Sequence, residues 1–358
     1  MANPSIPAGP DEITAQWLST VLGTPVDDVT VSPIGTGQTG ATYRVVPTYG
    51  SGGGELPETF VVKLPSQDAE VRARASFGYQ AEHAFYTEVA DTVRVPMPRC
   101  YHCDIDSGGT DFVLLLSDMA PAVQGDQIAG CGVQEAELAV RALAGLHGPR
   151  WCDPAWRDFA GAAMGKPDED SAKGLGDIFT MAVGMTLEKL GSRLSQEDAA
   201  TLNDVATVMT PWLLLEPDRF SVLHGDFRLD NLLFDPDHTR ISVVDWQTLA
   251  VGLPARDLAY FIASGLEPQL RARTERDLVD AYHRELLAHG VRDYDAETCW
   301  RDYKLGLLQV PLITALAVAF VQSTERGDDV MVAMIERSCR AIRDLDTLQL
   351  VRELSAAS

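Results

Sequence analysis

The sequence predicts an α+β protein of two lobes: a small N-terminal lobe with an antiparallel β-sheet and a large, mainly helical C-terminal lobe. Short runs of β-branched and aromatic residues dominate the chain up to residue 116, whereas helical periodicity fills most of 155–215 and 270–350. We therefore expect the first lobe over 1–116, a connector over 117–121 and the second lobe over 122–358.

The first lobe should begin with a helix and continue with strands. Apolar residues at helical spacing predict a helix over 11–22, with Asp11 as its capping residue. Three β-like runs follow, over 29–31, 41–46 and 60–64.

A second helix is predicted over 77–93, because apolar residues recur every four positions from Ala81 to Val93. A strand over 111–116 leads to the connector. The second lobe then opens with a helical pattern over 135–147.

Three short apolar runs interrupt the helices of the second lobe, over 220–223, 232–234 and 241–244. Each run stops just before polar residues, as strands do when they present side chains at the mouth of a cleft. We expect the chemistry of the protein at these strand ends.

The charge of the chain limits its partners. The 358 residues include 29 Lys and Arg against 52 Asp and Glu, which gives a formal net charge of −23. Such a field repels phosphate backbones and anionic lipid headgroups, so neither a nucleic acid nor a membrane surface is expected as a partner.

The first residues show no basic segment followed by an apolar run, so a cytoplasmic protein is expected. Cys100 and Cys103 form a lone C-x-x-C, and without a second pair a structural zinc site is not expected there. The apolar stretch 305–321 is interrupted by Gln309 and Pro311 and is interpreted as a core helix rather than a membrane span.

The polar residues after these runs match the needs of phosphoryl transfer. In the loop HGDFRLDN, residues 224–231, Asp226 would accept a proton, Arg228 would stabilise charge on the transferred group, and Asn231 would bind a metal ion. The later VVDWQ adds Asp245 as a second oxygen ligand for Mg²⁺. Asp and Asn also cap turns and end strands, but the order and spacing of the whole set favour the catalytic interpretation.

Together with GLPARDLAY, residues 252–260, these loops resemble the aminoglycoside phosphotransferase and choline kinase superfamily, whose members share the protein-kinase fold. The form DWQ, residues 245–247, is most similar to its ecdysteroid-kinase-like branch. The likeness runs from about Ile34 to about Gly265. It implies ATP or GTP as the phosphate donor and a hydroxyl of a small molecule as the acceptor.

A glycine-rich motif, GTGQTG, lies between the first two β-like runs. Dinucleotide sites carry the same G-x-G-x-x-G pattern, but there the motif opens a helix, whereas here it runs into a β segment. We therefore expect a strand-turn-strand flap over the nucleotide phosphates, made of Gly35, Thr36, Gly37, Gln38, Thr39 and Gly40.

Lys63 lies in the run after this flap, like the phosphate-binding lysine of V-A-I-K. Glu82, in AEHAFY, matches the family's glutamate just before Phe-Tyr and is the expected partner of this lysine. Glu88 and Glu70 are the alternatives.

The connector should bind the adenine through its backbone, as the hinge does in this fold. The expected lining residues are Leu116, Ser117, Asp118 and Met119. An ordinary linker between lobes would occupy the same position in the sequence.

The resemblance gives His224 a bracing role and Asp257 a role in tying the loop backbone, and His147 is expected to be a packing histidine. Only eleven residues, 246–256, separate the metal-binding Asp from the RDLA motif, and no A-P-E motif follows. A peptide-docking segment is therefore missing, which disfavours a protein substrate.

The acceptor is expected against the helical stretches 155–215 and 298–325, which contain Trp156, Phe159, Trp300, Tyr303 and Phe320. Aromatic walls would suit a steroid-, terpenoid- or macrolide-like alcohol, and an acidic rim would suit an aminocyclitol or choline. Two other functions stay open: a nucleotide-binding module without turnover, and an NAD-dependent dehydrogenase built on the glycine motif. The assembly is expected to be a monomer or a homodimer.

Overall fold

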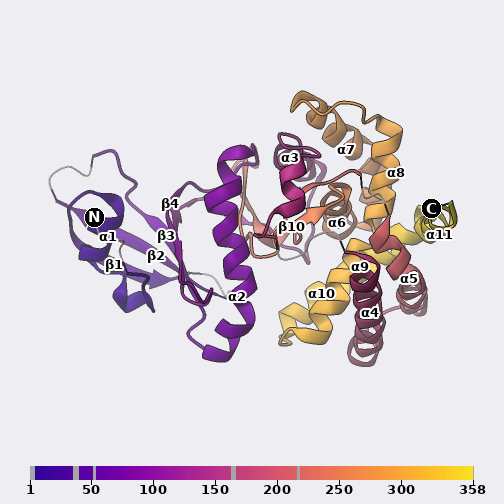
Figure 1. The fold of residues 1–358 in the computed structure, drawn as a ribbon, viewed down its shortest axis with the longest axis horizontal. Helices are drawn as coiled ribbons and strands as arrows, with labels where there is room; N and C mark the ends of the chain where they lie inside the picture. The colour runs from indigo at the N-terminus through magenta and orange to yellow at the C-terminus, as the bar shows by residue number, and fades with distance from the viewer. Residues whose placement is uncertain (1–4, 35–39, 51–53, 163–166, 216–217, 358) are drawn as a thin grey trace.

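The computed structural model describes residues 5–34, 40–50, 54–162, 167–215 and 218–357. A β-sheet lobe lies at one end of the molecule and a helical lobe at the other, with helix α2 between them (Figure 1). The predicted fold class is confirmed.

The sheet of the first lobe has the strand order β1-β2-β3-β5-β4, and all neighbouring strands are antiparallel. Its strands are β1 (Val26–Pro33), β2 (Gly40–Tyr49), β3 (Phe60–Pro65), β4 (Cys100–Ile105) and β5 (Phe112–Ser117). Strand β4 was not predicted, because its six side chains are all half-buried and therefore show no alternation of polar and apolar residues.

The first helix, α1 (Ala15–Leu22), packs on this sheet through Trp17 and Leu18. Its capping residue is Thr14, whose hydroxyl accepts a hydrogen bond from the backbone of Trp17 at 3.1 Å. The predicted cap, Asp11, is wrong because it lies in a separate 3₁₀ turn, η1 (Pro10–Glu12).

Helix α2 (Ala69–Ala84) begins eight residues before its predicted start, at the cap Asp68. None of its first eight residues is buried, so they carry no apolar stripe from which the start could be predicted. After α2 the chain forms a π turn, η2 (Phe85–Val89), and a 3₁₀ turn, η3 (Ala90–Thr92).

The π turn joins α2 to the second lobe. The ring of Phe85 stacks on that of Trp246, with centroids 3.6 Å apart and planes 6° from parallel. Ala81, Phe85 and Val89 belong to the core of the helical lobe, whereas Tyr79 packs with Phe112 on the β-sheet. Helix α2 therefore contacts both lobes.

The helices of the second lobe surround one large core. They are α3 (Val133–His147), α4 (Glu169–Leu190), α5 (Gln196–Leu214), α6 (Ala255–Gly265), α7 (Pro268–Ala288), α8 (Ala296–Gly306), α9 (Gln309–Phe320), α10 (Glu325–Asp344) and α11 (Thr347–Ala357), with the short turn η4 (Pro154–Asp158) after α3. The stretch Ala296–Phe320 is long and apolar enough to cross a membrane by length and composition, but 67% of its most apolar window is buried in the protein.

Two small antiparallel sheets place the polar loops of this lobe. Strands β6 (Val123–Gln124), β8 (Leu232–Phe234) and β9 (Ile241–Val243) form one sheet, and β7 (Ser221–Leu223) pairs with β10 (Ala250–Gly252) in the other. The turn η5 (Leu229–Asn231) leads directly into β8.

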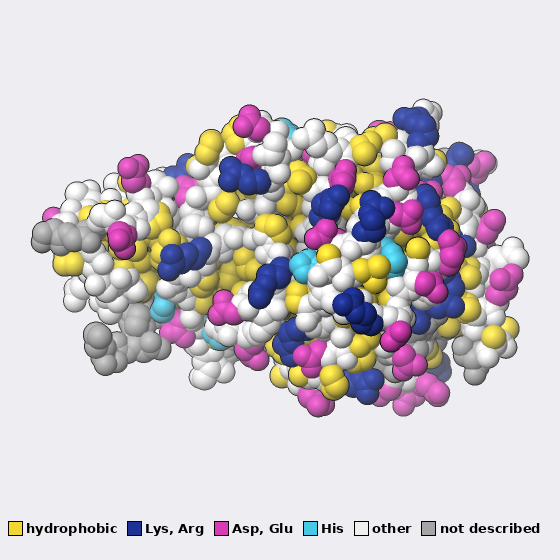
Figure 2. Space-filling model, turned by 90° about the horizontal axis from the view of Figure 1, so that it is seen from above, with side chains coloured by type: hydrophobic (Ala, Val, Ile, Leu, Met, Phe, Trp, Pro, Cys, Tyr) yellow, Lys and Arg dark blue, Asp and Glu magenta, His cyan; other side chains and the backbone are white. Residues whose placement is uncertain are grey.

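The surface of the helical lobe carries both signs of charge. Figure 2 shows acidic and basic side chains interspersed over this lobe as seen from above. On this face the excess of negative charge is not gathered into one patch.

Candidate active site

Three charged side chains from separate elements meet where the lobes join. The ammonium group of Lys63, on β3, lies 2.7 Å from Glu82 Oε2 on α2 and 2.9 Å from Asp245 Oδ1, just after β9. Glu70 and Glu88, the alternative partners for this lysine, are exposed. The sheet is thus tied both to α2 and to the helical lobe.

Burial and charge compete at this cluster. Burial would lower the pKa of Lys63, but the charges of Asp245 and Glu82 outweigh it and hold that pKa above its ordinary value. Burial raises the pKa of Glu82, and Lys63 only partly offsets this effect. Partial burial would also raise the pKa of Asp245, but the charge and hydrogen bond of Lys63, together with the charges of His224 and Arg228, outweigh burial. The pKa of Asp245 therefore lies below its ordinary value, and this group stays ionised.

The carboxylate of Asp226 accepts three hydrogen bonds from its own lobe. The hydroxyl of Tyr260 donates to Oδ1 at 2.7 Å, and Arg228 Nε and Asn231 Nδ2 donate to Oδ2 at 3.0 and 3.1 Å. The charge of Asp226 in turn raises the pKa of Arg228, which also contacts Asp230 at 3.1 Å and remains a cation.

The two predicted metal ligands, Asn231 and Asp245, lie at neighbouring strand ends, because the backbone of Val244 donates to the carbonyl of Asn231 at 3.0 Å. The amide nitrogen of Asn231 binds the backbone and side chain of Asp226, so its amide oxygen is directed away from that residue. Asp245 has a φ of +68°, a conformation that costs energy for a residue with a side chain and is frequent at functional sites.

The backbone of the loop is held by Asp257 on α6, whose oxygens accept from the amides of His224 at 2.7 Å and Gly225 at 3.0 Å. The imidazole of His224 donates from Nε2 to the carbonyl of Val244 at 3.0 Å, which leaves Nδ1 to accept from the amide of Asp226 at 3.3 Å. These contacts support the bracing roles that the resemblance implies.

His147 is fully buried and lies 2.8 Å from the hydroxyl of Tyr282 and 3.3 Å from Asp257. His147 therefore supports Asp257, the residue that holds the loop, and makes no contact with Asp226 among those described. Gly225 has a φ of +83°, and a Cβ there would lie 2.2 Å from the carbonyl oxygen of Thr248. Glycine is thus required directly before Asp226.

The residues of the predicted connector lie at and directly after the end of strand β5. Leu116 and Ser117 end strand β5, and the carboxylate of Asp118 binds Arg44 on β2 at 2.6 Å. Burial alone would raise the pKa of Asp118, but the hydrogen bonds from Arg44, the backbone of Ala120 and Thr59, together with the charge of Arg44, bring that pKa below its ordinary value. Ser117 donates to the sulfur of Met119 at 3.7 Å.

Most of the expected flap, Gly35, Thr36, Gly37, Gln38 and Thr39, lies outside the described residues. Gly40 opens β2 directly beside Lys63: a Cβ at Gly40 would lie 3.1 Å from the carbonyl oxygen of Leu64 and 3.6 Å from Cε of Lys63. A larger residue at this position would crowd the lysine.

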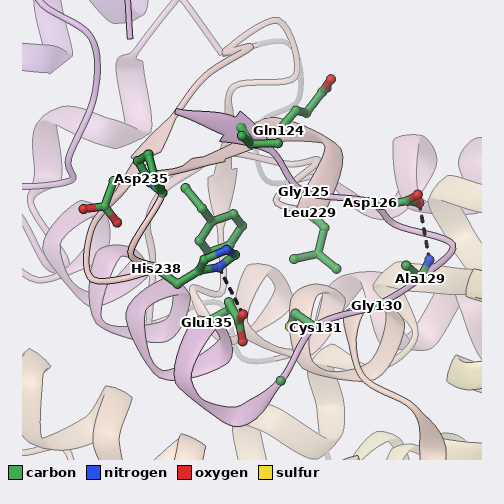
Figure 3. Close-up of a pocket in the computed structure, with 14 residues that line it drawn as sticks. Gln124, Gly125, Asp126, Ala129, Gly130, Cys131, Glu135, Leu229, Asp235 and His238 are labelled. Atoms are coloured by element: carbon green, nitrogen blue, oxygen red, sulfur yellow. Dashed lines mark hydrogen bonds and ion pairs between the residues drawn. The ribbon is translucent and has the colours of Figure 1, made fainter. Parts of the chain in front are cut away.

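A cavity of about 550 Å³ lies beside this region, under the edge of the β6-β8-β9 sheet (Figure 3). It is lined by Phe234 and by Leu229 of the loop 224–231, and His238 contacts Glu135 at its wall, at 3.1 Å. None of the charged side chains described above, from Lys63 to Asp245, is among its lining residues, so this cavity is separate from their cluster.

The prediction that aromatic residues line the acceptor site is wrong for most of them. Trp156 is 3% exposed, and Tyr303 is fully buried with its hydroxyl on Glu275 at 2.8 Å. Trp300 stacks on Tyr303 with centroids 5.2 Å apart. These rings form part of the core, as helical apolar stripes usually do, whereas Phe320 is 58% exposed.

Tyr260 is the residue of this site that sequence analysis missed. It lies in the motif RDLAY, three positions after Asp257, and residues three apart share one face of a helix. That spacing could have placed its side chain beside the loop that Asp257 holds.

Solved structures show the same fold. A protein of Ralstonia eutropha JMP134, provisionally named an aminoglycoside phosphotransferase, superposes with a TM-score of 0.56 at 17% identity, over 92% of this chain and 97% of that one. The GDP complex of aminoglycoside 2'-phosphotransferase-IIIa gives a TM-score of 0.54 at 14% identity, over 90% and 98%.

Similarity to curated sequences is partial. Acyl-CoA dehydrogenase family member 11 of Gallus gallus is 26% identical over 170 residues, which are 46% of this chain and 20% of that protein. The Homo sapiens protein of this name is 33% identical over 90 residues, 23% of this chain and 12% of that protein. The matches thus span a fifth or less of these relatives.

A family model covers most of the chain. The model of the phosphotransferase enzyme family matches residues 30–297, a range that includes Lys63, Glu82, the loop 224–231 and Asp245. The chain therefore belongs to the phosphotransferase enzyme family.

Proposed function

We propose that the protein is a kinase that transfers the γ-phosphate of ATP, or of GTP, to a hydroxyl group of a small molecule. One observation carries this proposal: Lys63, from the β-sheet lobe, meets Asp245 of the helical lobe directly beside Asn231 and Asp226. Phosphoryl transfer needs this combination of a cation for the phosphates, oxygen ligands for a metal and a carboxylate for the alcohol.

Magnesium fits the donor set. The amide oxygen of Asn231 and the carboxylate of Asp245 are hard oxygen ligands, and Mg²⁺ in nucleotide sites uses one or two such groups together with the phosphates. The ion would supply positive charge to the phosphates.

The chain's own residues have separate tasks. Lys63 would hold the phosphates, and the backbone at Leu116, Ser117, Asp118 and Met119 would bind the adenine. The alcohol oxygen forms a bond to the γ-phosphorus as the bond to the leaving nucleoside diphosphate breaks, and Asp226 receives the proton of the alcohol. Arg228 would offset charge on the transferred group.

The acceptor is proposed to be a small molecule, and the segment that follows Asp245 supports this. This segment, residues 246–256, has only eleven residues, and its strand β10 pairs with β7. Little unpaired chain is left to bind a peptide. The DWQ form favours the ecdysteroid-kinase-like branch and a steroid-, terpenoid- or macrolide-like alcohol. Aminoglycosides, which the names of the structural neighbours suggest, and choline-like compounds are the other classes. We propose that the enzyme acts in the cytoplasm as a monomer or homodimer.

The test measures ADP release from Mg·ATP with a sterol, a macrolide, an aminoglycoside and choline as acceptors, and repeats it with Mg·GTP. We expect one class to stimulate turnover, and Asp226→Ala to abolish that stimulation. Binding of nucleotide without any turnover that depends on Asp226 would contradict the kinase proposal and favour a regulatory nucleotide-binding module.

A further inference from the structure

The carboxylate of Asp226 has a defined number of places for the incoming alcohol. Its two oxygens together offer about four lone-pair sites. Oδ2 already accepts from Arg228 and Asn231, and Oδ1 accepts from Tyr260. Among the residues that the structure describes, the carboxylate thus has two donors on Oδ2 and one on Oδ1, so the remaining lone pair is on Oδ1, the oxygen that the tyrosine holds.

Tyr260 is well placed to fix that oxygen. It is 1% exposed, and its backbone carbonyl accepts a hydrogen bond from Ser264 at 2.6 Å. Burial, followed by the charge of Asp226, raises the pKa of the Tyr260 hydroxyl well above its usual value, so the group keeps its proton and acts as a donor.

The same helix face holds the loop at two levels. Asp257 binds the backbone amides of His224 and Gly225, and Tyr260, one turn further along α6, binds the side chain of the next residue. Asp257 therefore sets the course of the backbone, whereas Tyr260 fixes Oδ1 of the carboxylate, as Arg228 and Asn231 fix Oδ2.

We infer that Tyr260 is a positioning residue for phosphoryl transfer: its hydroxyl occupies one lone pair of Asp226 Oδ1 and directs the other toward the hydroxyl of the acceptor. The inference rests on the proposed function and deepens it. Without the hydrogen bond from Tyr260, only the two hydrogen bonds to Oδ2 oppose rotation of the carboxylate about the Cβ–Cγ bond. Oδ1 would then be misaligned with the hydroxyl of the alcohol.

The experiment compares Tyr260→Phe with a matched control, Tyr303→Phe. Both are buried tyrosines that donate to a carboxylate, at 2.7 and 2.8 Å, but Tyr303 binds Glu275 in the core. Two reactions are measured. One is hydrolysis of Mg·ATP, with water as the acceptor and phosphate release as the readout. The other is phosphorylation of the best alcohol of the panel by Mg·ATP, with ADP release as the readout. Both variants are assayed below their measured melting temperatures.

We expect Tyr260→Phe to lower kcat by about 10- to 100-fold with the KM for ATP within about twofold, because misplacement of a reacting group acts on the chemical step. Tyr303→Phe should leave kcat within about twofold. In an Asp226→Ala background Tyr260→Phe should cause no further loss, since the two residues act as one unit.

Two results would overturn the inference: a kcat for Tyr260→Phe equal to that of Tyr303→Phe, or the same fold-loss when Asp226 is already alanine. The second result would assign Tyr260 a purely structural role. A wild-type protein without any turnover that depends on Asp226 would instead refute the kinase proposal, and the inference with it.

Discussion

Two carboxylates of the helical lobe, Asp226 and Asp245, are held in different ways. Asp245 is fixed by Lys63 from the opposite lobe, and its side chain is 42% exposed. Asp226 is fixed by Tyr260, Arg228 and Asn231, all from its own lobe, and its side chain is 22% exposed.

We expect this difference to separate nucleotide binding, to which Asp245 and Lys63 contribute, from the chemical step, to which Asp226 contributes. The contact of Asp245 with Lys63 depends on how the lobes sit, and under the proposed function phosphate would replace Asp245 as the partner of Lys63. The position of Asp226 is set in advance, whatever the spacing of the lobes. Substitutions around Asp226 should therefore act on kcat, and substitutions around Lys63 should act on nucleotide binding and on stability.

The strongest test of this contrast is Asp226→Ala. We expect kcat to fall by about a thousandfold, within the usual contribution of a general base, while the KM for ATP changes by less than about threefold. Steady-state ADP release measures both constants. A large change in KM would show that Asp226 also shapes nucleotide binding and would break the contrast.

Lys63→Met should act on the other carboxylate. It leaves Glu82 and Asp245 beside each other without a cation, so we expect the free energy of unfolding to fall by about 2–3 kcal/mol, less than for a fully buried pair because Asp245 is partly exposed. Urea titration measures it. The control is Lys173→Met, an exposed lysine of α4, which should change stability by less than about 0.5 kcal/mol. An equal effect of the two substitutions would refute the role of the cluster.

Gly225→Ala tests whether the course of the loop before Asp226 is fixed. A Cβ would meet Thr248 at 2.2 Å and the residue would keep a φ of +83°, so we expect a loss of about 2–3 kcal/mol and a lower kcat. Gly23→Ala is the control, because its φ is +64° but no atom lies within 4 Å of its Cβ. It should cost about 1 kcal/mol. Similar losses for both would mean that the contact with Thr248 is easily relieved.

The smallest effect is expected at the connector. Because the folded pKa of Asp118 lies below its unfolded value, the Arg44 pair contributes stability above about pH 4 and loses it as the pH falls through the folded pKa. We expect Asp118→Asn to cost about 0.5–1 kcal/mol at pH 7 and to flatten the stability curve below pH 4. Thermal unfolding across pH 2.5–7 measures both. An unchanged acid slope would show that the pair contributes nothing.

The sequence predicted the site residues that lie in short motifs, and the family resemblance supplied the pairing of Lys63 with Glu82. The loop 224–231 and Asp245 follow strands, so spacing along the chain is also spacing in the structure. The contacts of Tyr260 and Arg44 were not predicted, because their partners lie 34 and 74 positions away. For Tyr260, the three-residue spacing from Asp257 was the one available signal.

The errors have a physical cause as well. The start of α2 was missed because its first buried residue is Tyr79, so the turns before it carry no periodic signal. Trp156 and Tyr303 were assigned to the acceptor site because an apolar helical face looks the same in the sequence whether it covers a ligand or a core.

The stack of Phe85 on Trp246 has a consequence for motion. It joins the end of α2 to the residue that follows Asp245. We therefore expect α2 to move together with the helical lobe when the two lobes separate to exchange nucleotide. The sheet would then move relative to α2 at the apolar contacts of Tyr79, Phe112 and Leu114. The ion pair between Lys63 and Glu82 joins the sheet to α2 and would oppose this movement.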